Sequence, residues 1–169
     1  MTLRLVELSL DAMLALLAGD LSGASARSGV HLTDYFVSDD SVWLWRIRVD
    51  QIRQDPTTAR WFARAAVDEE SGLVIGHAGY HGPPDETGMV EVGYSVDPRY
   101  RRRGHACAML AELLRRAEVE PGVRTVRASI SPDNVASLAT VARFGFDQVG
   151  EQWDEEDGLE LVFEVPVQP

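Results

Sequence analysis

The segment DPRYRRRGHACAML, residues 97–110, collects side chains and backbone that suit the binding of an anion. Four arginines stand within positions 99–103 of a chain whose formal net charge is -11, and Gly104 and Ala106 follow them at once. A glycine at a helix start lets several backbone N–H groups point one way, and with the positive end of the helix dipole they form a phosphate cradle. Neighbouring arginines add charge-assisted contacts. A solvated basic turn is the alternative, but the glycine, the small residue and the arginines together favour a phosphate site.

Other phosphate-binding motifs and nucleic acid are excluded by the same composition. All 16 basic residues are arginine, so no P-loop lysine exists, and no G-x-G-x-x-G follows a strand. The missing lysine also excludes a lysine nucleophile or Schiff base. A pI near 4.7 argues against nucleic acid as a partner, because binding to its backbone needs a broad basic face.

Length and composition predict one soluble globular domain over residues 1–169, with 45% hydrophobic and 25% charged residues. No apolar run has the length of a membrane span, so we expect no membrane partner. The N-terminus, MTLRLVELSLDAML, lacks the features of a signal peptide. The single cysteine, Cys107, cannot form an internal disulfide, and we therefore expect a cytoplasmic protein.

Hydrophobic periodicity and turn residues predict a mixed α/β (α+β) fold with a central β-meander. Strands are expected at 3–8, 60–69, 73–82, 89–97, 123–130, 146–152 and 159–165. Helices are expected at 9–18, 42–54 and 106–117, and over about eleven residues after SPDN and before Gly145. Residues 19–29 are rich in glycine and serine and are expected to form a loop.

Four stretches, in order, resemble the GNAT superfamily of acetyl-CoA-dependent N-acetyltransferases. They are GLVIGHAGYHG (72–82), VEVGYSV (90–96), VDPRYRRRGHACAMLAELL (96–114) and SPDNVASLATVARFGF (131–146). The third fits the family's pyrophosphate-binding pattern [QR]-x-x-G-x-[GA] through Arg101, Gly104 and Ala106. The N-x-x-S of Asn134 and Ser137 looks most like the branch of ribosomal-protein N-terminal acetyltransferases.

The resemblance implies a mixed, mostly antiparallel central sheet with helices on both faces and splayed strands at the cofactor site. Backbone N–H groups of residues 102–106 would hold the CoA pyrophosphate, and neighbouring arginines would reach the 3′-phosphate. The strand ending at Val96 would bind the pantetheine arm and donate a hydrogen bond to the thioester carbonyl. Asn134 would contact the same arm, although Asp133 or Asn134 also suits a helix N-cap. The implied cofactor residues are Tyr94, Ser95, Val96, Arg101, Arg102, Arg103, Gly104, His105, Ala106, Asn134 and Ser137.

Acetyl transfer needs a neutral amine, and an ordinary amine with a pKa near ~10 is neutral in about one molecule in a thousand at pH 7. Glu91 matches the acidic residue of the family's E-[IV]-G-Y strand and is the expected base, acting through a water; an ordinary polar-face glutamate is the alternative. His77 and His81 are further base candidates, with a structural or substrate-lining role as the alternative. Without a third ligand at suitable spacing, they predict no metal site.

The family's usual acid is a tyrosine seven residues after the asparagine, where this chain has Val141. Ser137 is the expected substitute, unless it serves only as a local capping residue or the thiolate needs no acid. Cys107 is expected to pack rather than to act as a nucleophile. Tyr35, Trp43, Trp45 and Trp61 lie in the region that shapes the acceptor pocket in the family.

The expected function is direct acetyl transfer from acetyl-CoA to an amine in a ternary complex. The acceptor is left open among a protein N-terminus, an amino acid, a polyamine and an aminoglycoside-like drug; the acidic composition agrees with a cationic one. A non-catalytic acyl-CoA-binding sensor is the alternative, favoured by the missing tyrosine. A plain α/β domain would leave the loop and the Asn-Ser segment unexplained. Because dimers are common in the family, a homodimer is among the expected assemblies.

Overall fold

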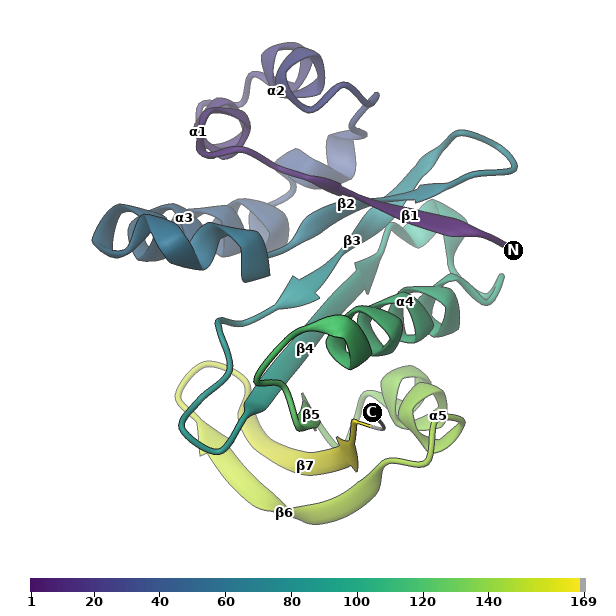
Figure 1. Cartoon of the computed structure of the whole chain (residues 1–169). Coiled ribbons are helices and arrows are strands. Elements are labelled where there is room, and N and C mark those ends of the chain that lie inside the picture. Colours follow the sequence, from purple (N-terminus) through teal and green to yellow (C-terminus); the bar gives the residue numbers. More distant parts are fainter. Residues whose placement is uncertain (168–169) are drawn as a thin grey trace.

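The computed structural model describes residues 1–167 and has the mixed α/β architecture that the sequence predicts. One seven-stranded sheet has the strand order β1-β2-β3-β4-β5-β7-β6. The strands are β1 (Leu3–Glu7), β2 (Arg64–Asp68), β3 (Val74–Tyr80), β4 (Met89–Val96), β5 (Thr125–Ile130), β6 (Asp147–Asp154) and β7 (Gly158–Pro166). The α-helices are α1 (Leu10–Leu17), α2 (Leu21–Ser28), α3 (Asp39–Gln54), α4 (His105–Val119) and α5 (Val135–Ala142). Helices cover both faces of the sheet, with α3 and α4 on opposite sides of β3 and β4 (Figure 1).

The sheet is antiparallel except between β4 and β5, and there it opens. β4 pairs with β3 from Val92 to Val96, but it pairs with β5 only through Met89–Glu91, opposite residues 125–127. Beyond that point β5 continues along β7 alone. Because the two parallel strands run in the same direction, the gap between them widens toward Val96. The splayed strands expected from the family resemblance are therefore present.

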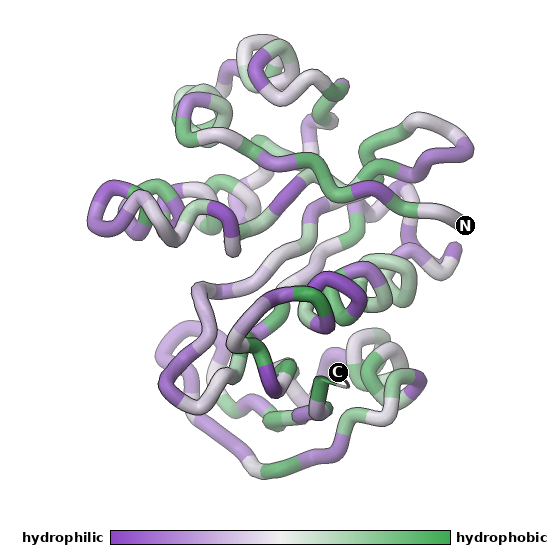
Figure 2. The backbone as a smooth tube through the Cα atoms, in the orientation of Figure 1, coloured by the Kyte–Doolittle hydropathy of each residue, from purple (hydrophilic) through white to green (hydrophobic). Residues whose placement is uncertain are grey.

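Side chains of β4 alternate between two hydrophobic cores. Val90 and Val92 are buried on the face that packs against α4, where they meet Met109, Leu110 and Leu113. Glu91, Gly93 and Ser95 alternate with them and face α3. In Figure 2 the turns of α3 and α4 alternate between hydrophilic and hydrophobic, as expected for helices with one face on a sheet.

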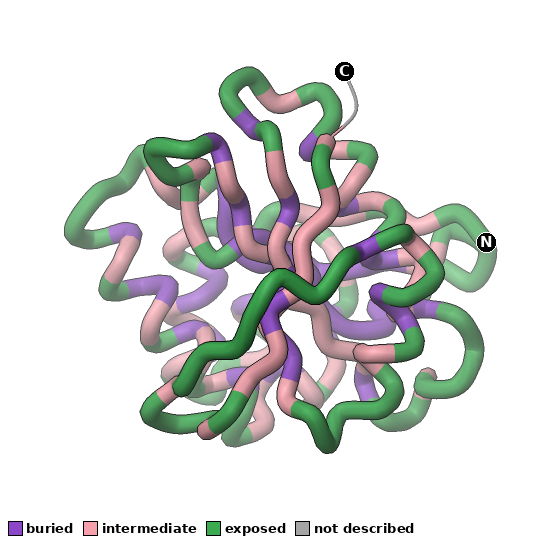
Figure 3. Tube along the Cα trace, turned by 90° about the horizontal axis from the view of Figure 1, so that it is seen from below, coloured by how far each residue is buried: buried purple, intermediate pink, exposed green. Residues whose placement is uncertain are grey.

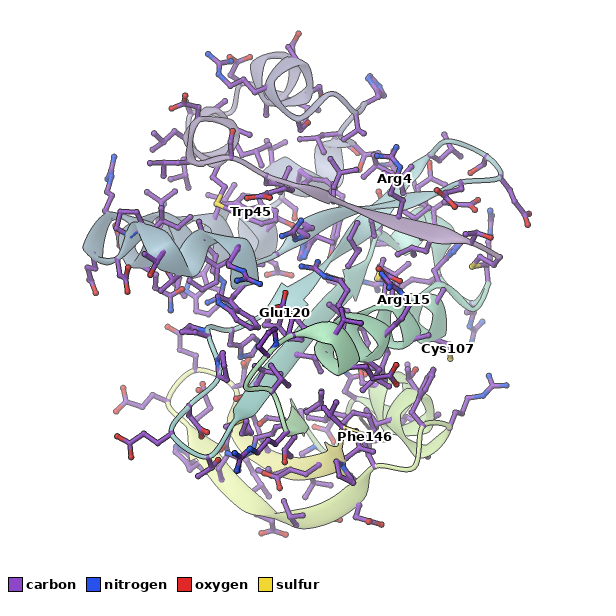
Figure 4. The ribbon with its side chains drawn as sticks, in the orientation of Figure 1. Arg4, Trp45, Cys107, Arg115, Glu120 and Phe146 are labelled. Carbon is purple, nitrogen blue, oxygen red and sulfur yellow. The ribbon has the colours of Figure 1, made fainter. Side chains whose placement is uncertain are left out.

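The core on the α3 side is built around Trp45. Its indole N–H donates to the carbonyl of Phe36 at 2.8 Å, and the two rings stack with centroids 5.8 Å apart. Phe36 lies in the short 3-10 helix η1 (Asp34–Val37), and Ser38 caps the start of α3 by accepting from the N–H of Ser41. Figure 4 shows Trp45 among the side chains that fill the space around α3. This packing holds the N-terminal half of α3 over the open end of β4.

The expected loop over 19–29 is wrong, because residues 21–28 form α2. Asp20 accepts from the N–H of Gly23 at 2.8 Å, and the Ser28 hydroxyl donates back to the carbonyl of Ala24 at 2.9 Å. Ala24 is fully buried. Capping and this one anchoring contact outweigh the low helix propensity of the serine and glycine residues.

Several element boundaries also differ from the sequence prediction, including those of one strand and two helices. The strand predicted from residue 60 begins at Arg64, because Asp55 caps a 3-10 helix, η2 (Pro56–Trp61). The helix predicted from residue 42 begins at Asp39, one residue after its cap. The last helix ends at Ala142, before Gly145 takes a left-handed φ of +72°. At the outer edge of the sheet β6 is exposed along nearly its whole length (Figure 3).

Candidate functional site

The loop after β4 is held by one of its own arginines. Asp97 is buried and accepts from the backbone N–H and guanidinium of Arg99, while Thr33 donates to its other oxygen at 3.1 Å. Arg99 also pairs with Asp34 at 2.5 Å. The guanidinium of Arg99 is therefore occupied within the protein. It fixes the loop rather than meeting a ligand.

The other arginines of this loop are in different environments. Arg101 donates from Nε to the carbonyl of Val96 at 3.0 Å. Arg102 and Arg103 are exposed, and Arg103 lies 6.0 Å from the centroid of the Tyr100 ring. Arg102 and Arg103 take part in no ion pair within residues 1–167. These two side chains are thus available to an anion.

The predicted phosphate cradle, residues 102–106, lies with residue 107 in a stretch of free backbone donors. Within the described chain, none of its N–H groups donates a hydrogen bond, and no side chain caps the start of α4. Arg102 and Gly104 both take left-handed conformations, with φ of +62° and +82°. A β-carbon at Gly104 would meet nothing within 4 Å. The free donors, at the positive end of a helix of 15 residues, therefore border open space.

A cavity of about 600 Å³, called here the loop cavity, lies between this cradle and α5. Every cofactor residue predicted from the sequence lines it except Arg103: these are Tyr94, Ser95, Val96, Arg101, Arg102, Gly104, His105, Ala106, Asn134 and Ser137. Tyr100, Cys107, Ala136 and Thr140 complete the lining. The Asn134 side chain caps α5 by accepting from the N–H of Ser137 at 3.1 Å, so its capping role is present. Its amide N–H₂ remains free to donate.

The position of the missing tyrosine does not face this cavity. Val141 is buried in the core, whereas Ser137 and Thr140 on the same helix line the loop cavity. The Tyr94 hydroxyl from β4 enters the same place, buried and without a hydrogen-bond partner among the described residues. Burial raises the pKa of Tyr94 above its usual value, and the nearby hydroxyls of Ser137 and Thr140 offset only part of that rise. Sequence reasoning assigned Tyr94 to the cofactor site but missed this hydroxyl.

On the opposite face of the sheet, β3 and β4 form a row of cross-strand pairs. His77 stands opposite Ser95 and Gly79 opposite Gly93, while the N–H of His81 donates to the carbonyl of Glu91 at 2.8 Å. A β-carbon at Gly93 would lie 2.8 Å from His81 Nε2. The two glycines therefore allow the His81 ring to approach Gly93 and the backbone of Phe62 and Ala63 to approach Gly79.

Two cavities occupy this face. The inner cavity, of about 150 Å³, lies over the glycine pair and is lined by Leu44, Arg48, Ala63, His77, Gly79, Tyr80, His81, Gly93, Tyr94 and Ser95. The acidic cavity, of about 640 Å³, is lined by Tyr35, Asp39, Asp40, Ser41, Trp43, Leu44, His77, Tyr94, Ser95, Arg101, Glu156 and Asp157. Tyr94 and Ser95 line all three cavities. The two faces of the sheet thus meet where β4 separates from β5.

The expected base, Glu91, lies beside the inner cavity rather than in its wall. Its Oε1 is 3.7 Å from Nδ1 of His81, which does line that cavity. Burial lowers the pKa of His81, the Glu91 carboxylate raises it, and the Arg48 charge lowers it. An imidazole of lowered pKa remains an unprotonated acceptor at neutral pH.

His77 is a structural residue in this arrangement. It is buried, stacks on Tyr35 with ring centroids 5.7 Å apart, and lies 3.4 Å from the Ser41 hydroxyl. Burial, and secondarily the charge of Arg48, lowers the pKa of His77 to about 4. Such an imidazole is a poor proton acceptor at neutral pH. Tyr35 in turn hydrogen-bonds to the Ser95 hydroxyl, so this stack supports the end of β4.

With this geometry in place, comparisons identify the family. Residues 2–147 match the acetyltransferase (GNAT) domain.

The chain belongs to the GNAT acetyltransferase family.

A curated relative, the uncharacterized N-acetyltransferase YjdG of Bacillus subtilis (strain 168), is 30% identical over 80 residues. That match covers 47% of this chain and 48% of the relative, so the chain spans about half the length of the relative it matches.

Solved structures share the fold at low identity. A phosphinothricin acetyltransferase from Sinorhizobium meliloti, in complex with AcCoA, has a TM-score of 0.63 and 21% identity, covering 99% of this chain and 89% of that one. A spermidine N-acetyltransferase SpeG chimera from Vibrio cholerae and hSSAT has a TM-score of 0.69 and 10% identity, covering 98% and 96%. The names of these two proteins indicate different acceptors, phosphinothricin and spermidine. The GNAT fold therefore leaves the acceptor to be argued from the site.

The structure also adds to this GNAT site residues that sequence reasoning did not select. Arg48, Asp39, Asp40, Glu156 and Asp157 enter the two cavities on the α3 face from segments far apart in the chain. Tyr35 and Trp43 line the acidic cavity as expected for the acceptor region, whereas Trp45 and Trp61 are core residues. No cluster of metal-ligating side chains occurs in residues 1–167, and no helix in that range is long and apolar enough to cross a membrane. Of these residues, the sequence alone marks only Asp39 and Asp40, as acidic residues at the start of a predicted helix.

The buried His77 predicts a pH-dependent stability. The pKa of His77 is about 4 in the folded chain and about 6.5 in the unfolded chain, so the unfolded chain binds the proton more tightly. The contribution of His77 to the free energy of unfolding is therefore fully present above pH ~6.5. It decreases by about 3 kcal/mol as the pH falls to about 4. Denaturant unfolding of the wild type and His77→Gln at pH 7 and pH 4.5 measures the loss.

The wild type should lose more stability than His77→Gln over this interval. His31→Gln, at an exposed histidine, is the control and should behave as the wild type. An equal loss in the wild type and His77→Gln would show that His77 is not the group that titrates.

Proposed function

We propose that this protein transfers the acetyl group of acetyl-CoA directly to a primary amine, in a ternary complex. The observation that supports it most is the meeting of three cavities at Tyr94 and Ser95, where β4 separates from β5. A thioester entering from the loop cavity and an amine entering from the α3 face would approach each other through this gap. Direct attack then needs no covalent enzyme intermediate.

The loop cavity offers what each part of CoA requires. Free N–H groups of residues 102–107 suit the diphosphate, and the unpaired guanidinium groups of Arg102 and Arg103 suit the 3′-phosphate. Beyond Glu91, the edge of β4 that faces β5 has no strand partner, so its backbone groups can bind the pantetheine amides. A backbone N–H near Ser95 would then stabilise the developing oxyanion.

The Glu91–His81 pair supplies the base in this proposal. His81 Nε2 points toward Gly93 in the inner cavity, and Nδ1 faces the Glu91 carboxylate. The imidazole would take the proton of the attacking amine, while the carboxylate orients the ring and stabilises the imidazolium. Glu91, which the family resemblance implies as the base, is in this proposal a positioning residue that acts through His81.

Ser137 and Tyr94 are the proposed donors to the departing CoA sulfur. Both hydroxyls reach the loop cavity, and Tyr94 brings from β4 the phenol that position 141 lacks. A thiolate with a pKa near ~8.5 is already a tolerable leaving group, so this contribution is modest.

The proposed acceptor is a protein N-terminus or a small amine with further positive charge. Asp39, Asp40, Glu156 and Asp157 line the acidic cavity, and none of them forms an ion pair within the described part of the chain. Trp43, 45% exposed, adds an aromatic face on which a cation can rest. The N-x-x-S segment supports a place in the ribosomal-protein branch.

A single domain in the cytoplasm and a homodimer complete the proposal. The single cysteine supports a reducing compartment. The homodimer rests on the family resemblance, and sedimentation velocity distinguishes it from a monomer.

The phosphate cradle is tested by Gly104→Asp. A carboxylate placed in the cradle repels the diphosphate, and φ of +82° is strained for any side chain, so the dissociation constant of acetyl-CoA should rise at least tenfold. Isothermal titration calorimetry measures it. Gly122→Asp is the matched control, because Gly122 has φ of +88°, equally open surroundings and a position outside the loop cavity. Equal affinities in the two variants would refute the cradle.

Transfer and its base are tested by release of free CoA thiol with a panel of N-terminal peptides, polyamines, amino acids and aminoglycosides. Acceptor-dependent release should fall at least tenfold in both variants, because His81→Gln removes the base and Glu91→Gln removes the carboxylate that orients it. The double variant should be no slower than His81→Gln, since the two residues act as one unit. Tight acetyl-CoA binding without turnover on any amine would favour the sensor.

The two hydroxyl donors are tested by Ser137→Ala and Tyr94→Phe. Each should lower kcat by about three- to tenfold while leaving acetyl-CoA affinity within about twofold, because each stabilises mainly the departing thiolate. Ser71→Ala is the control and should keep the wild-type kcat: it removes an exposed hydroxyl that donates to Asp68 outside the three cavities. An unchanged kcat in both variants would show that the thiolate leaves without a donor.

A further inference from the structure

Arg48 of α3 is a buried cation without a counterion. Its exposed fraction is 7%, and its guanidinium lies 5.0 Å from the centroid of the Phe62 ring. Both of its hydrogen bonds come from Nη1, to Gln51 Oε1 at 2.8 Å and to the carbonyl of His81 at 3.4 Å. Nε is buried and has no partner, and across residues 1–167 Arg48 takes part in no ion pair. The Nε–Nη2 edge, which binds carboxylates side-on, is therefore unused.

An unpaired buried guanidinium is costly unless a ligand neutralises it. Burial lowers the pKa of Arg48 to about 10, partly offset by the charge of Glu91, so it still carries its proton at neutral pH. The charge of Glu91 raises the pKa of Arg48, but the Glu91 carboxylate lies 3.7 Å from Nδ1 of His81 and forms no ion pair with Arg48. Neither Glu91 nor another described side chain neutralises Arg48 by direct contact. The free edge thus lacks the anion that usually accompanies a buried arginine.

The inner cavity beside Arg48 has room for a small polar group such as a carboxylate and its neighbouring atoms. Arg48 lines the inner cavity of about 150 Å³, together with His81, Gly93 and Ser95. The His81 ring lies against Gly93, and the backbone of Phe62 and Ala63 lies against Gly79. An anionic group bound at Arg48 would therefore place its neighbouring atoms beside His81 and Ser95. That is where the proposed base and the gap between β4 and β5 meet.

We propose that Arg48 binds the carboxylate of the acceptor, and that the acceptor is a free α-amino acid with a basic side chain. Its α-amine then lies next to His81 and Ser95. The inner cavity and the acidic cavity share Leu44, His77, Tyr94 and Ser95 in their linings. A positively charged side chain would extend past these shared residues toward Asp39, Asp40, Glu156 and Asp157. A protein N-terminus has no carboxylate beside its amine and would leave Arg48 unpaired.

This inference rests on the proposed acetyl transfer, and matched acceptors test it separately. Arginine, argininamide and agmatine share a side chain and differ only in the carboxylate. The wild type should use arginine with a kcat/KM at least tenfold above that of the other two. In Arg48→Met this preference should disappear, because arginine falls to the level of argininamide while argininamide itself changes less than threefold. Lysine and cadaverine repeat the comparison with a second side chain.

Two further variants separate recognition from folding. Arg46→Met, at an exposed arginine of the same helix, should keep the wild-type preference. Arg48→Lys keeps the charge and should retain part of the preference while losing side-on geometry. The melting temperature of each variant reports whether the fold is intact. Equal use of arginine and argininamide by the wild type, or an equal fall for both in a folded Arg48→Met, would overturn the proposal.

Calorimetric titration of arginine and argininamide into the CoA-saturated protein gives a readout without turnover. Arginine should bind at least tenfold more tightly than argininamide in the wild type and equally in Arg48→Met. If no amine supports thiol release, the proposed transfer fails, yet this titration still decides whether Arg48 recognises a carboxylate. Failure of arginine to bind would overturn the inference, and turnover with N-terminal peptides alone would do so while leaving acetyl transfer intact.

Discussion

The short pairing between β4 and β5 is the constraint on which the site depends. The two strands share a register over Met89–Glu91 and then separate, while β4 stays bound to β3 and β5 to β7. The divergence leaves backbone donors and acceptors free in the middle of a sheet, where they would otherwise be paired. It also connects the two faces at Ser95. A continuous sheet would keep the loop cavity and the α3 face apart.

Charge is distributed around this opening in a way that the net value of -11 conceals. One face has a cationic loop with free N–H groups, which suits a polyanion. The other face has four carboxylates at the rim and the single buried guanidinium of Arg48 deeper in. Opposite charges in these two neighbouring cavities would orient a zwitterion, because the reversed pose places like charges together.

Most residues predicted for the loop site line one cavity, because the residues that form it are nearly contiguous in the sequence. The arginines, Gly104, Ala106 and the helix start lie within a few residues, so local geometry follows from local sequence. The α3 face was largely missed for the opposite reason. In RIRVDQIRQ, Arg48 looks like its neighbours Arg46 and Arg53, and only packing against Phe62 and β3 makes it a buried, unpaired charge. Likewise, Asp39 and Asp157 share a cavity only because the β6–β7 turn folds over the start of α3. Arg99, one of the four arginines of the loop, is held by Asp97 and Asp34, and the sequence alone did not distinguish it from the other three.

The contacts of Asp97 link the two sides of the site mechanically. Asp97 anchors the loop through Arg99, while Thr33 and Asp34 tie the same pair to η1. Tyr35 in η1 then hydrogen-bonds to Ser95 and stacks on His77 in the wall of the acidic cavity. The segment that holds one ligand and the segment that bounds the other are thus ordered by one network. A substitution that breaks this network would therefore disturb both sides of the site at once.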